Sequence, residues 1–400
     1  MQILIVEDDI DTLNLLTVFV QKFDNTVLTA RNGVEAWKII QKEPVSMVIS
    51  DWMMPEMDGL QLCKKIRSTD LKRYIYFILL TTKNSTNELI AGMEAGADDF
   101  IVKPFNRGEL KVRIRAGERI IELERNLEER NKRLREAYHT INKDLKAAAA
   151  MQKSLLPTVE TEIGDIHFEW LLLPCAGIAG DILNFFRLDE NNIGFYLLDV
   201  SGHGIQAAML SVTLSKLISP SPIQGSPLKH FTSIPPYYGI TPPALAISDL
   251  NNRFQIDHDY MQYFTIIYGT IHLKNGIIRL CQAGHPSPIF LKKKGKISLI
   301  GSGGFPVGLL MDMKYTQVEF DFQPGDRLFL YSDGVTECTN QAKMQFSQQQ
   351  LIRLIKKYRS QALNEVLENI KNQLCKWKGN NDFQDDVSIL AIERKKSKNT

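Results

Sequence analysis

Short apolar runs alternate with amphipathic stretches over the first 105 residues of the chain. The apolar runs fall at Ile3–Val6, Val27–Ala30, Met47–Ser50, Phe77–Leu80 and Phe100–Val102. Runs of this kind, separated by segments of helix length, are typical of buried parallel strands that helices connect. The pattern therefore predicts an α/β fold, with a doubly wound five-stranded parallel sheet and helices on both of its faces.

A different pattern runs from Asn106 to Leu155. This segment has no proline, little glycine and densely spaced charges, which predicts one long exposed helix, or two in series, ending at Pro157. Apolar residues recur at every seventh position along it, at Ile120, Leu127, Leu134, Ile141, Ala148 and Leu155. The companion positions, which include Asn131 and Gln152, are mixed. We expect a coiled-coil linker that joins two copies in a homodimer; the alternative is a helix packed on its own domains.

The pattern changes again between residues 160 and 392, where many short β-like runs are separated by Gly, Pro and Asn turns. This favours a second domain of mixed α and β structure, and 400 residues are more than one hydrophobic core usually organises. We expect a first domain over 1–120, a helical linker over 106–156, a second domain over 157–393 and a basic tail over 394–400.

Seven of the sixteen prolines lie between Ser219 and Ala244. Proline at this density predicts a surface loop without regular structure. Two roles remain open for this segment, an insertion without function or a lid or docking segment.

Composition narrows the classes of partner. The formal net charge is only +2, from 48 basic and 46 acidic side chains, so no large positive field is available to attract nucleic acid. No apolar run approaches the ~20 residues of a membrane span, and the first residues do not resemble a signal peptide. The five cysteines are scattered without a CxxC pair, as expected in a reducing compartment. We therefore expect a cytoplasmic protein with no nucleic-acid or membrane partner.

Polar residues follow four of the first five predicted strands. Glu7 and Asp8 follow the first strand, Asp51 the third, Thr81 the fourth and Lys103 the fifth. The carboxyl ends of parallel strands form one edge of the sheet, so these side chains are expected to converge there. Clustered carboxylates suit Mg²⁺, and a phosphoryl group on one of them would be stabilised by the metal, the hydroxyl and the ammonium.

The motifs at this edge resemble those of a response-regulator receiver domain. They are VEDD at 6–9, DWMMP at 51–55, LLTT at 79–82 and KPF at 103–105. The resemblance implies that Asp51 accepts a phosphoryl group from a histidine kinase and that Glu7 and Asp8, with Asp51, hold Mg²⁺. It also implies that Thr81 and Phe100, together with the lysine of KPF, respond to phosphorylation.

Acidic residues of the second half also lie beside glycine or at the edges of β-like runs. They are Asp181, Asp199, Asp333, Asp385 and Asp386. Singly, each is consistent with a turn-forming residue. Together they follow apolar strands such as Phe195–Leu198 and Leu328–Tyr331, so they can meet at one end of a sheet, where their mutual repulsion would require a metal. Oxygen ligands without His or Cys favour Mg²⁺ or Mn²⁺ over Zn²⁺.

An ordered series of motifs in this half resembles the metal-dependent protein phosphatase 2C superfamily, in particular its bacterial branch that regulates sigma-factor partner switching. The series comprises MQKSLLP at 151–157, GD at 180–181, DVSGHG at 199–204, AGHPSP at 283–288, GFPVGL at 304–309, PGDRLFLYSDGVTE at 324–337 and DDVSIL at 385–390. The resemblance implies an α+β fold, a β-sandwich flanked by helices.

The same resemblance implies two Mn²⁺ or Mg²⁺ ions that activate a water molecule. Asp199 would be shared between the ions beside the carbonyl of Val200, and Asp199 and Asp333 are the expected catalytic residues. Asp181, Asp333 and Asp385 would complete the metal shells, and Asp386, which is also counted among the metal-site residues, would contact metal or substrate only indirectly. Ala179 replaces a glycine that the family usually has before GD, so the local turn is expected to differ. His203 is a candidate proton donor to the leaving oxygen.

These resemblances predict a two-component response regulator whose phosphorylation controls a phosphoserine or phosphothreonine protein phosphatase. Its expected substrate is a phosphorylated anti-anti-sigma-like protein. The alternatives are a catalytically silent scaffold that binds a sigma-pathway partner and a transcriptional regulator. The second is disfavoured because no helix-turn-helix pattern follows the linker.

Overall fold

The computed structural model describes residues 1–82, 86–157, 161–175, 177–220, 225–255, 262–301, 303–380 and 382–395. It divides into two compact units, Met1–Thr140 and Ile141–Thr400, and each unit is described by itself. The basic tail expected over 394–400 lies outside the described residues from 396 onward. Among the described residues, no helix is both long and apolar enough to cross a membrane.

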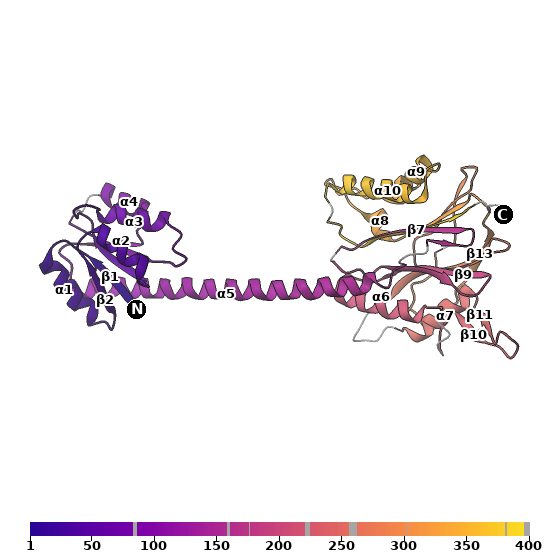
Figure 1. Ribbon diagram of the computed structural model, residues 1–400, viewed down its shortest axis with the longest axis horizontal. Coiled ribbons are helices and arrows are strands. Elements are labelled where there is room, and N and C mark those ends of the chain that lie inside the picture. Colours follow the sequence, from indigo (N-terminus) through magenta and orange to yellow (C-terminus); the bar gives the residue numbers. More distant parts are fainter. Residues whose placement is uncertain are drawn as a thin grey trace. The chain divides into compact units, whose positions relative to one another are not determined.

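The first unit is a five-stranded parallel sheet with helices on both faces (Figure 1). Its strand order is β2-β1-β3-β4-β5. The strands are β1 (Gln2–Val6), β2 (Thr26–Ala30), β3 (Met47–Asp51), β4 (Tyr76–Thr81) and β5 (Asp99–Val102). The predicted α/β class is confirmed, and each predicted strand agrees with the observed one to within one residue at either end.

Successive residues of the strands in this unit supply two cores. Leu4 and Val6 of β1 pack with residues of α2 (Gly33–Lys42) and α3 (Gly59–Ser68) on one face. Ile3 and Ile5 pack on the other face with α1 (Ile10–Gln21) and the start of α5. The remaining helix, α4, spans Thr86–Glu94. Burial on both faces explains why the central strands β1, β3 and β4 are continuously apolar rather than alternating.

The segment after β5 forms one continuous helix, α5 (Arg107–Lys153). Of the two possibilities in the sequence, the single long helix is correct. Three residues of the apolar row, whose members recur at every seventh position, are largely exposed: Leu127 at 54%, Leu134 at 69% and Ile141 at 57%. Exposed leucines at this spacing are what a coiled-coil partner would cover, and the dimer itself remains a prediction.

The second unit is a sandwich of two antiparallel sheets (Figure 1). One sheet has the order β16-β13-β12-β9-β8 and the other β15-β14-β17-β18-β7-β6. The strands of the first sheet are β8 (Ile182–Arg187), β9 (Asn192–Val200), β12 (Phe264–His272), β13 (Ile277–Ala283) and β16 (Gln317–Asp321). Those of the second are β6 (Glu162–Ile163), β7 (Ile166–Leu173), β14 (Ile289–Leu291), β15 (Ile297–Leu299), β17 (Arg327–Tyr331) and β18 (Val387–Arg394).

Helices cover the outer faces of this sandwich. The helices α6 (Ile205–Leu217) and α7 (Pro243–Arg253) contact the first sheet, whereas α9 (Ser347–Lys357) and α10 (Leu363–Lys378) pack on the second. The largest core lies between the sheets, where Phe168 stacks on Phe185 with ring centroids 4.1 Å apart. The expected α+β sandwich flanked by helices is confirmed.

The proline-rich segment is not entirely irregular, so that prediction was wrong in part. Its described residues include a short antiparallel hairpin, β10 (Lys229–Phe231) and β11 (Tyr238–Ile240). Proline cannot donate to a strand ladder, and here the prolines lie outside the paired residues: Pro235 and Pro236 form part of the turn, and Pro243 is the first residue of α7. Residues 221–224 lie outside the described part.

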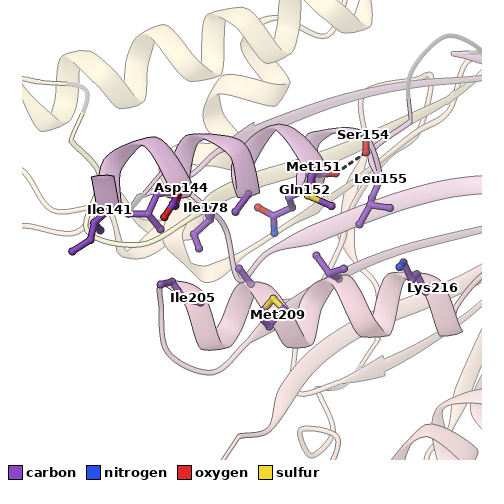
Figure 2. A pocket seen from close by; sticks show the side chains of 14 residues that line it. Ile141, Asp144, Met151, Gln152, Ser154, Leu155, Ile178, Ile205, Met209 and Lys216 are labelled. Atoms are coloured by element: carbon purple, nitrogen blue, oxygen red, sulfur yellow. Dashed lines mark hydrogen bonds between the residues drawn. The ribbon is translucent and has the colours of Figure 1, made fainter. Parts of the chain in front are cut away.

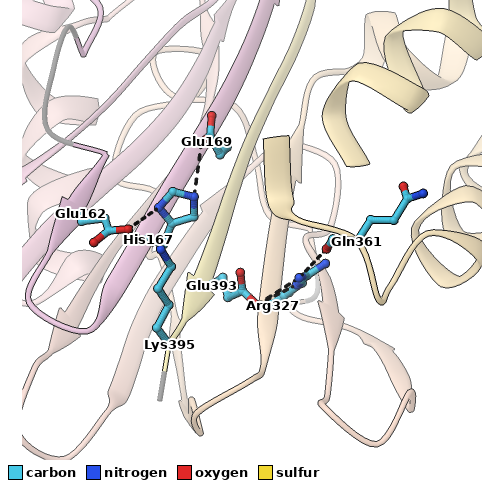
Figure 3. Close-up of polar contacts among 7 residues, drawn as sticks. All are labelled: Glu162, His167, Glu169, Arg327, Gln361, Glu393 and Lys395. Carbon is cyan, nitrogen blue, oxygen red and sulfur yellow. Dashed lines mark hydrogen bonds and ion pairs between the residues drawn. The ribbon is translucent and has the colours of Figure 1, made fainter. Parts of the chain in front are cut away.

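Cross-strand ion pairs hold the C-terminal strand at the outer face of the second sheet (Figure 3). Arg327 of β17 pairs with Glu393 of β18 at 3.0 Å and donates to the Gln361 carbonyl at 2.8 Å. On the adjacent β7, His167 lies between Glu162 and Glu169. The Arg327–Glu393 pair joins β17 to β18, and β18 directly follows the acidic pair Asp385–Asp386.

Candidate active site

The first unit brings its predicted acidic residues together at the carboxyl edge of the sheet. Oxygen atoms of Glu7, Asp8 and Asp51 lie within 4.8 Å of one another. Lys103 Nζ is 2.8 Å from both Asp51 Oδ1 and Glu7 Oε2. Thr81, the last residue of β4, is 2% exposed at the same edge. This arrangement can hold a divalent cation beside Asp51, with an ammonium group already in place.

The ion pairs of this pocket oppose the cost of burying charge. Burial raises the pKa of Glu7, while the hydrogen bond from Lys103 acts in the opposite direction. Burial alone would lower the pKa of Lys103, but its hydrogen bonds to Asp51 and Glu7 outweigh that effect and raise the pKa. The lysine therefore stays charged. Phe100, the predicted switch aromatic, lies in β5 and packs at the edge of the core.

In the second unit, the predicted acids lie at strand ends of both sheets. Asp181 directly precedes β8, and Asp199 is the second-last residue of β9. Asp333 begins the short helix α8 (Asp333–Glu337) just after β17. Asp385 and Asp386 precede β18. Each sheet thus contributes carboxylates at one end of the sandwich.

Strand register places these acids next to one another within each sheet. Ile182 pairs with Leu198, which sets Asp181 beside Asp199. In the other sheet, a Cβ on Gly334 would lie only 2.1 Å from the Asp386 carbonyl oxygen. Glycine is therefore required after Asp333, because the backbone there approaches β18 so closely.

The carboxylates of the two sheets also act on each other. Burial raises the pKa of Asp199 to about 8, and the charges of Asp333 and Asp385 on the opposite sheet add to the rise. Burial, with the Asp199 and Asp386 charges, raises the pKa of Asp181 well above its usual value. Burial likewise raises the pKa values of Asp333 and Asp385. This is an electrostatically unfavourable cluster, which an added cation would relieve.

Asp386 has a distinct environment. Its Oδ1 accepts a hydrogen bond from the backbone N–H of Cys175 at 2.8 Å, and its Oδ2 accepts from Gly180 at 2.6 Å and Asp181 at 3.4 Å. The side chain is 4% exposed. It therefore fastens the loop that carries Asp181 to the start of β18, which is consistent with an indirect contribution to a metal shell.

Gln152, one of the mixed companion positions along the helical segment, had no predicted contact with the site, and the structure places it behind this loop. Its Oε1 accepts from the Ala179 N–H at 2.9 Å, and its Nε2 donates to the Ala179 carbonyl at 2.6 Å and to Ser211 Oγ at 3.2 Å. One amide thus links the end of α5, the loop before Asp181 and helix α6. The only sequence signal was a polar residue inside an otherwise apolar helix end.

An apolar groove of about 660 Å³ lies beside Gln152 within the second unit (Figure 2). Ile141 and Met151 of α5 line one side, and Ile205 and Met209 of α6 line the other. Ala148 and Leu155, the last two residues of the apolar row with seven-residue spacing, also line the groove. The last part of that row therefore faces α6, which agrees with the predicted alternative of a helix packed on its own domain. Leu127 and Leu134, nearer the start of the helix, remain exposed.

A buried histidine lies behind Asp199. Thr265 of β12 is the cross-strand partner of Asp199, and its Oγ1 lies 2.7 Å from His285 Nδ1. Burial lowers the pKa of His285 to about 3, so the imidazole is neutral. The predicted carbonyl of Val200 follows Asp199 at the end of β9. Burial raises the pKa of Asp385, and an electrostatic interaction with the nearby His203 opposes part of that rise.

Two protein-family models match the chain. Residues 3–115 match the response regulator receiver domain, and residues 189–395 match stage II sporulation protein E (SpoIIE). The second match covers more than half of the 400 residues.

Individual relatives divide in the same way. Phosphoserine phosphatase RsbU of Bacillus subtilis (strain 168) is 26% identical over 265 residues, which are 66% of this chain and 73% of RsbU. Phosphoserine phosphatase RsbP of the same organism is 25% identical over 255 residues, 63% of this chain and 58% of RsbP. The chain thus spans less than two thirds of RsbP. Response regulator GtcR of Aneurinibacillus migulanus is 39% identical over 114 residues, 28% of this chain and 46% of GtcR.

Among solved structures, the SiaA-PP2C domain of Pseudomonas aeruginosa has the same fold as the second unit. The superposition has a TM-score of 0.55 at 17% identity and covers 64% of this chain and 98% of that domain. The motifs, the sandwich and the family matches agree. The chain belongs to the stage II sporulation protein E (SpoIIE) family, and it carries a response regulator receiver domain ahead of its phosphatase-like domain.

Proposed function

We propose that this chain is a metal-dependent protein phosphatase that hydrolyses phosphoserine or phosphothreonine on another protein. One observation carries the proposal: carboxylates from both sheets gather at one end of the sandwich, where burial, and after it the charges of the neighbouring acids, raises the pKa values of Asp181 and Asp199. A structural role would not bring together uncompensated acids in this way, whereas cation binding would. The phosphoserine phosphatases RsbU and RsbP are relatives of the same part of the chain.

The donor set fits hard divalent cations. Asp181 Oδ2 is buried and has no hydrogen-bond partner among the described residues. Oxygen ligands are those that Mg²⁺ and Mn²⁺ prefer. Asp199, Asp333, Asp181 and Asp385 would hold two such ions, with the Val200 carbonyl as a further ligand. When bound, the ions would supply an activated water and neutralise the phosphoryl oxygens.

The chain's own residues then have separate tasks. Asp199 and Asp333 orient the reacting groups from opposite sheets. Asp386 holds the Asp181 loop in place through three backbone N–H groups. His203, which interacts electrostatically with Asp385, is the proposed proton donor to the leaving serine oxygen.

The receiver would control this activity. Asp51, paired with Lys103, accepts a phosphoryl group from a histidine kinase while Glu7, Asp8 and Asp51 hold Mg²⁺. With a small phosphodonor and Mg²⁺, we expect one hydroxylamine-labile phosphoryl group on the receiver, absent from Asp51→Asn. A phosphoryl group that persists in Asp51→Asn would contradict the assignment.

The substrate we propose is a phosphorylated anti-anti-sigma-like protein, by analogy with the relatives RsbU and RsbP. The test incubates the full chain with such a phosphoserine protein in Mn²⁺ or Mg²⁺ and follows released phosphate. We expect turnover that a chelator abolishes and that added metal restores. Undiminished turnover in chelator would exclude the metal mechanism, whereas turnover only of other phosphoproteins would exclude the substrate.

We also propose that the active species is a cytoplasmic homodimer joined through α5. The exposed Leu127 and Leu134 support this, because they continue one row along the helix. Sedimentation of the full chain should give a dimer, and Leu127→Glu with Leu134→Glu should give a monomer that keeps the native circular dichroism.

A further inference from the structure

A row of residues crosses the first sheet of the phosphatase-like domain at the level of the acidic cluster. Thr265 of β12 lies opposite Asp199 of β9, and Asp181 lies on the other side of Asp199. The register of β12 with β13 continues the row to Gly284, which directly follows β13. Cross-strand partners place their side chains on the same face of a sheet, with Cβ atoms about 4.5–5.5 Å apart. The Thr265 hydroxyl therefore neighbours the Asp199 carboxylate.

A buried histidine follows the end of this row. Gly284 has a φ of +71°, and a Cβ there would lie only 2.8 Å from the ring of Pro306, so the chain turns at this point as only glycine readily allows. The next residue, His285, places its Nδ1 2.7 Å from Thr265 Oγ1. The imidazole is 2% exposed, and its Nε2 forms no hydrogen bond among the described residues. The turn thus brings the ring back onto the row, against Thr265.

The surroundings of His285 hold the ring in this position. Gln282 donates through Nε2 to the His285 carbonyl, and its Oε1 accepts from the Gly303 N–H at 2.9 Å. Burial lowers the pKa of His285 to about 3, and the backbone of Tyr331, the last residue of β17, opposes part of this fall. The ring is therefore neutral and lies between a strand of each sheet. In either tautomer, its Nδ1 can form a hydrogen bond with a hydroxyl group.

The contact with His285 limits what the Thr265 hydroxyl can do. A threonine hydroxyl has one donor hydrogen and two acceptor lone pairs, and its side chain can adopt different staggered rotamers. A hydrogen bond to a fixed imidazole selects one rotamer and leaves the rest of the hydroxyl's capacity for the neighbouring Asp199. Groups that orient a metal ligand from behind commonly change metal affinity by about ten- to a hundredfold.

We propose that His285 is a positioning residue of the phosphatase site, which fixes the Thr265 hydroxyl and through it orients the Asp199 carboxylate for cation binding. The inference rests on the proposed function, because it needs Asp199 as a cation ligand. His285 itself contacts neither cation nor substrate in this role. The histidine of the AGHPSP motif at 283–288 thereby acts on the site from the far end of the row.

Binding of Mn²⁺ tests the inference without an activity assay. Titration calorimetry is run on metal-free full-length protein carrying Asp51→Asn, which weakens cation binding by the receiver. Thr265→Val keeps the side-chain shape but removes the hydroxyl, Thr265→Ser keeps the hydroxyl, and Thr270→Val is the matched replacement at a buried position further along β12. We expect about tenfold weaker binding in Thr265→Val and changes below about twofold in the other two. Wild-type affinity in Thr265→Val, or an equal loss in Thr270→Val, would overturn the inference.

A double-mutant cycle shows whether His285 acts through Thr265. His285→Phe keeps a planar ring without nitrogen atoms and should also weaken Mn²⁺ binding about tenfold. Combined with Thr265→Val, it should lose no more than either single variant, because both replacements break one path. A loss near a hundredfold in the double variant would mean independent effects and would overturn the inference. If His285→Phe fails to fold, His285→Asn takes its place. Its amide can still bond to the Thr265 hydroxyl, so its affinity should stay within about threefold of wild type, and a tenfold loss would count against the inference.

Rates at saturating Mn²⁺ separate this inference from the proposed function. Because His285 and Thr265 position a ligand and take no part in the reaction, the kcat of Thr265→Val for the phosphoprotein should return to within about threefold of wild type, while the half-saturating Mn²⁺ concentration rises about tenfold. A fall in kcat at unchanged Mn²⁺ affinity would overturn the inference and leave the proposed function standing. If the Mn²⁺ affinities differ as expected but no phosphoprotein is hydrolysed, the proposed function fails and the positioning role stands.

Discussion

Two acidic clusters in this chain share the same residue type and differ in how their charge is balanced. In the receiver, Lys103 lies 2.8 Å from both Glu7 and Asp51 and supplies a cation from within the protein. In the phosphatase-like domain, Asp181, Asp199 and their neighbours have no lysine or arginine partner in the described residues, and burial raises the pKa of Asp199 to about 8.

The proposed metals would therefore act differently at the two sites. In the receiver, ion pairs of Lys103 already hold Glu7 and Asp51 together, so Mg²⁺ would bind to a preformed site. The phosphatase cluster is destabilised by its own charges, so cation binding there would be coupled to the stability of the folded domain. Removing charge should therefore have opposite consequences for stability in the two places.

The largest expected effect is a loss of hydrolysis rate when an acid of the phosphatase cluster is replaced. Asp199→Asn and Asp333→Asn should each lower the rate of phosphoprotein hydrolysis by at least about a hundredfold, because a ligand to the proposed cations is weakened; even indirect partners of metal ligands change activity by about ten- to a hundredfold. Rates are measured with saturating Mn²⁺.

The control for these variants is Asp382→Asn, which removes an exposed carboxylate from the same loop as Asp385. It should retain the wild-type rate. Equal loss in all three variants would mean that the loop, not the cluster, limits the rate.

The next effect is one of opposite sign. At about pH 9 without metal, Asp199→Asn should raise the free energy of unfolding of the phosphatase-like domain by at least about 1 kcal/mol, roughly 2–4 °C in melting temperature for a domain of this size. Lys103→Met should lower that of the receiver by about 2–4 kcal/mol, because it leaves Glu7 and Asp51 unpaired. Calorimetry with chelator measures both; a stability change of the same sign in both domains would contradict the comparison.

The pH dependence follows from the direction of the pKa shifts. A carboxyl group whose folded-state pKa lies above its unfolded value binds more protons when folded, so stability falls as pH rises. For Asp199 the window runs from its ordinary value of 3.8 up to about 8. Without metal, the melting temperature of the phosphatase-like domain should decline across this window. Saturating Mn²⁺ should remove most of the decline, and a decline unchanged by metal would assign it to other groups.

Local patterns determined much of what could be predicted from sequence. The central strands β1, β3 and β4 are continuously apolar because both sheet faces are buried there. Asp199 and Asp333 lie at the ends of apolar strands, as expected, whereas Asp181, Asp385 and Asp386 precede strands. The prediction of an irregular loop for the proline-rich segment rested on the density of prolines. The effect of proline on a strand depends on its position, and here the prolines lie outside the paired residues of β10 and β11. The contacts of Gln152 and Cys175 were beyond reach, since they join residues 27 and 211 positions apart.

Gln152 lies where the end of α5 contacts the loop of the phosphatase cluster, so its substitution should affect that cluster and not the receiver pocket. Gln152→Ala removes three hydrogen bonds of a buried amide, each worth about 0.5–1.5 kcal/mol net. The loop before Asp181 should loosen, so we expect about a five- to tenfold lower affinity for Mn²⁺ and no change in Mg²⁺ binding by the receiver. Gln152→Glu keeps the side-chain length but cannot donate a hydrogen bond. Its Mn²⁺ affinity should lie between those of the wild type and Gln152→Ala. Titration calorimetry reports both sites, and an unchanged Mn²⁺ affinity in Gln152→Ala would refute the link.

The smallest effect concerns how the two acidic sites communicate. Because α5 is one helix of 47 residues, a change at the receiver can reach Gln152 as a change in the rotational phase of the exposed row that includes Leu127 and Leu134. Deleting seven residues from the middle of α5 turns the helix by only about 20°, whereas deleting two turns it by roughly 200°. We expect the seven-residue deletion to keep the few-fold change in phosphatase rate on phosphorylation of Asp51 and the two-residue deletion to lose or invert it. Both deletions leave the two acidic clusters intact, so the basal Mg²⁺ affinity of the receiver serves as the internal control. Equal regulation in the two proteins would show that the helix only tethers the two sites, and that the charge balance of each is set independently of the other.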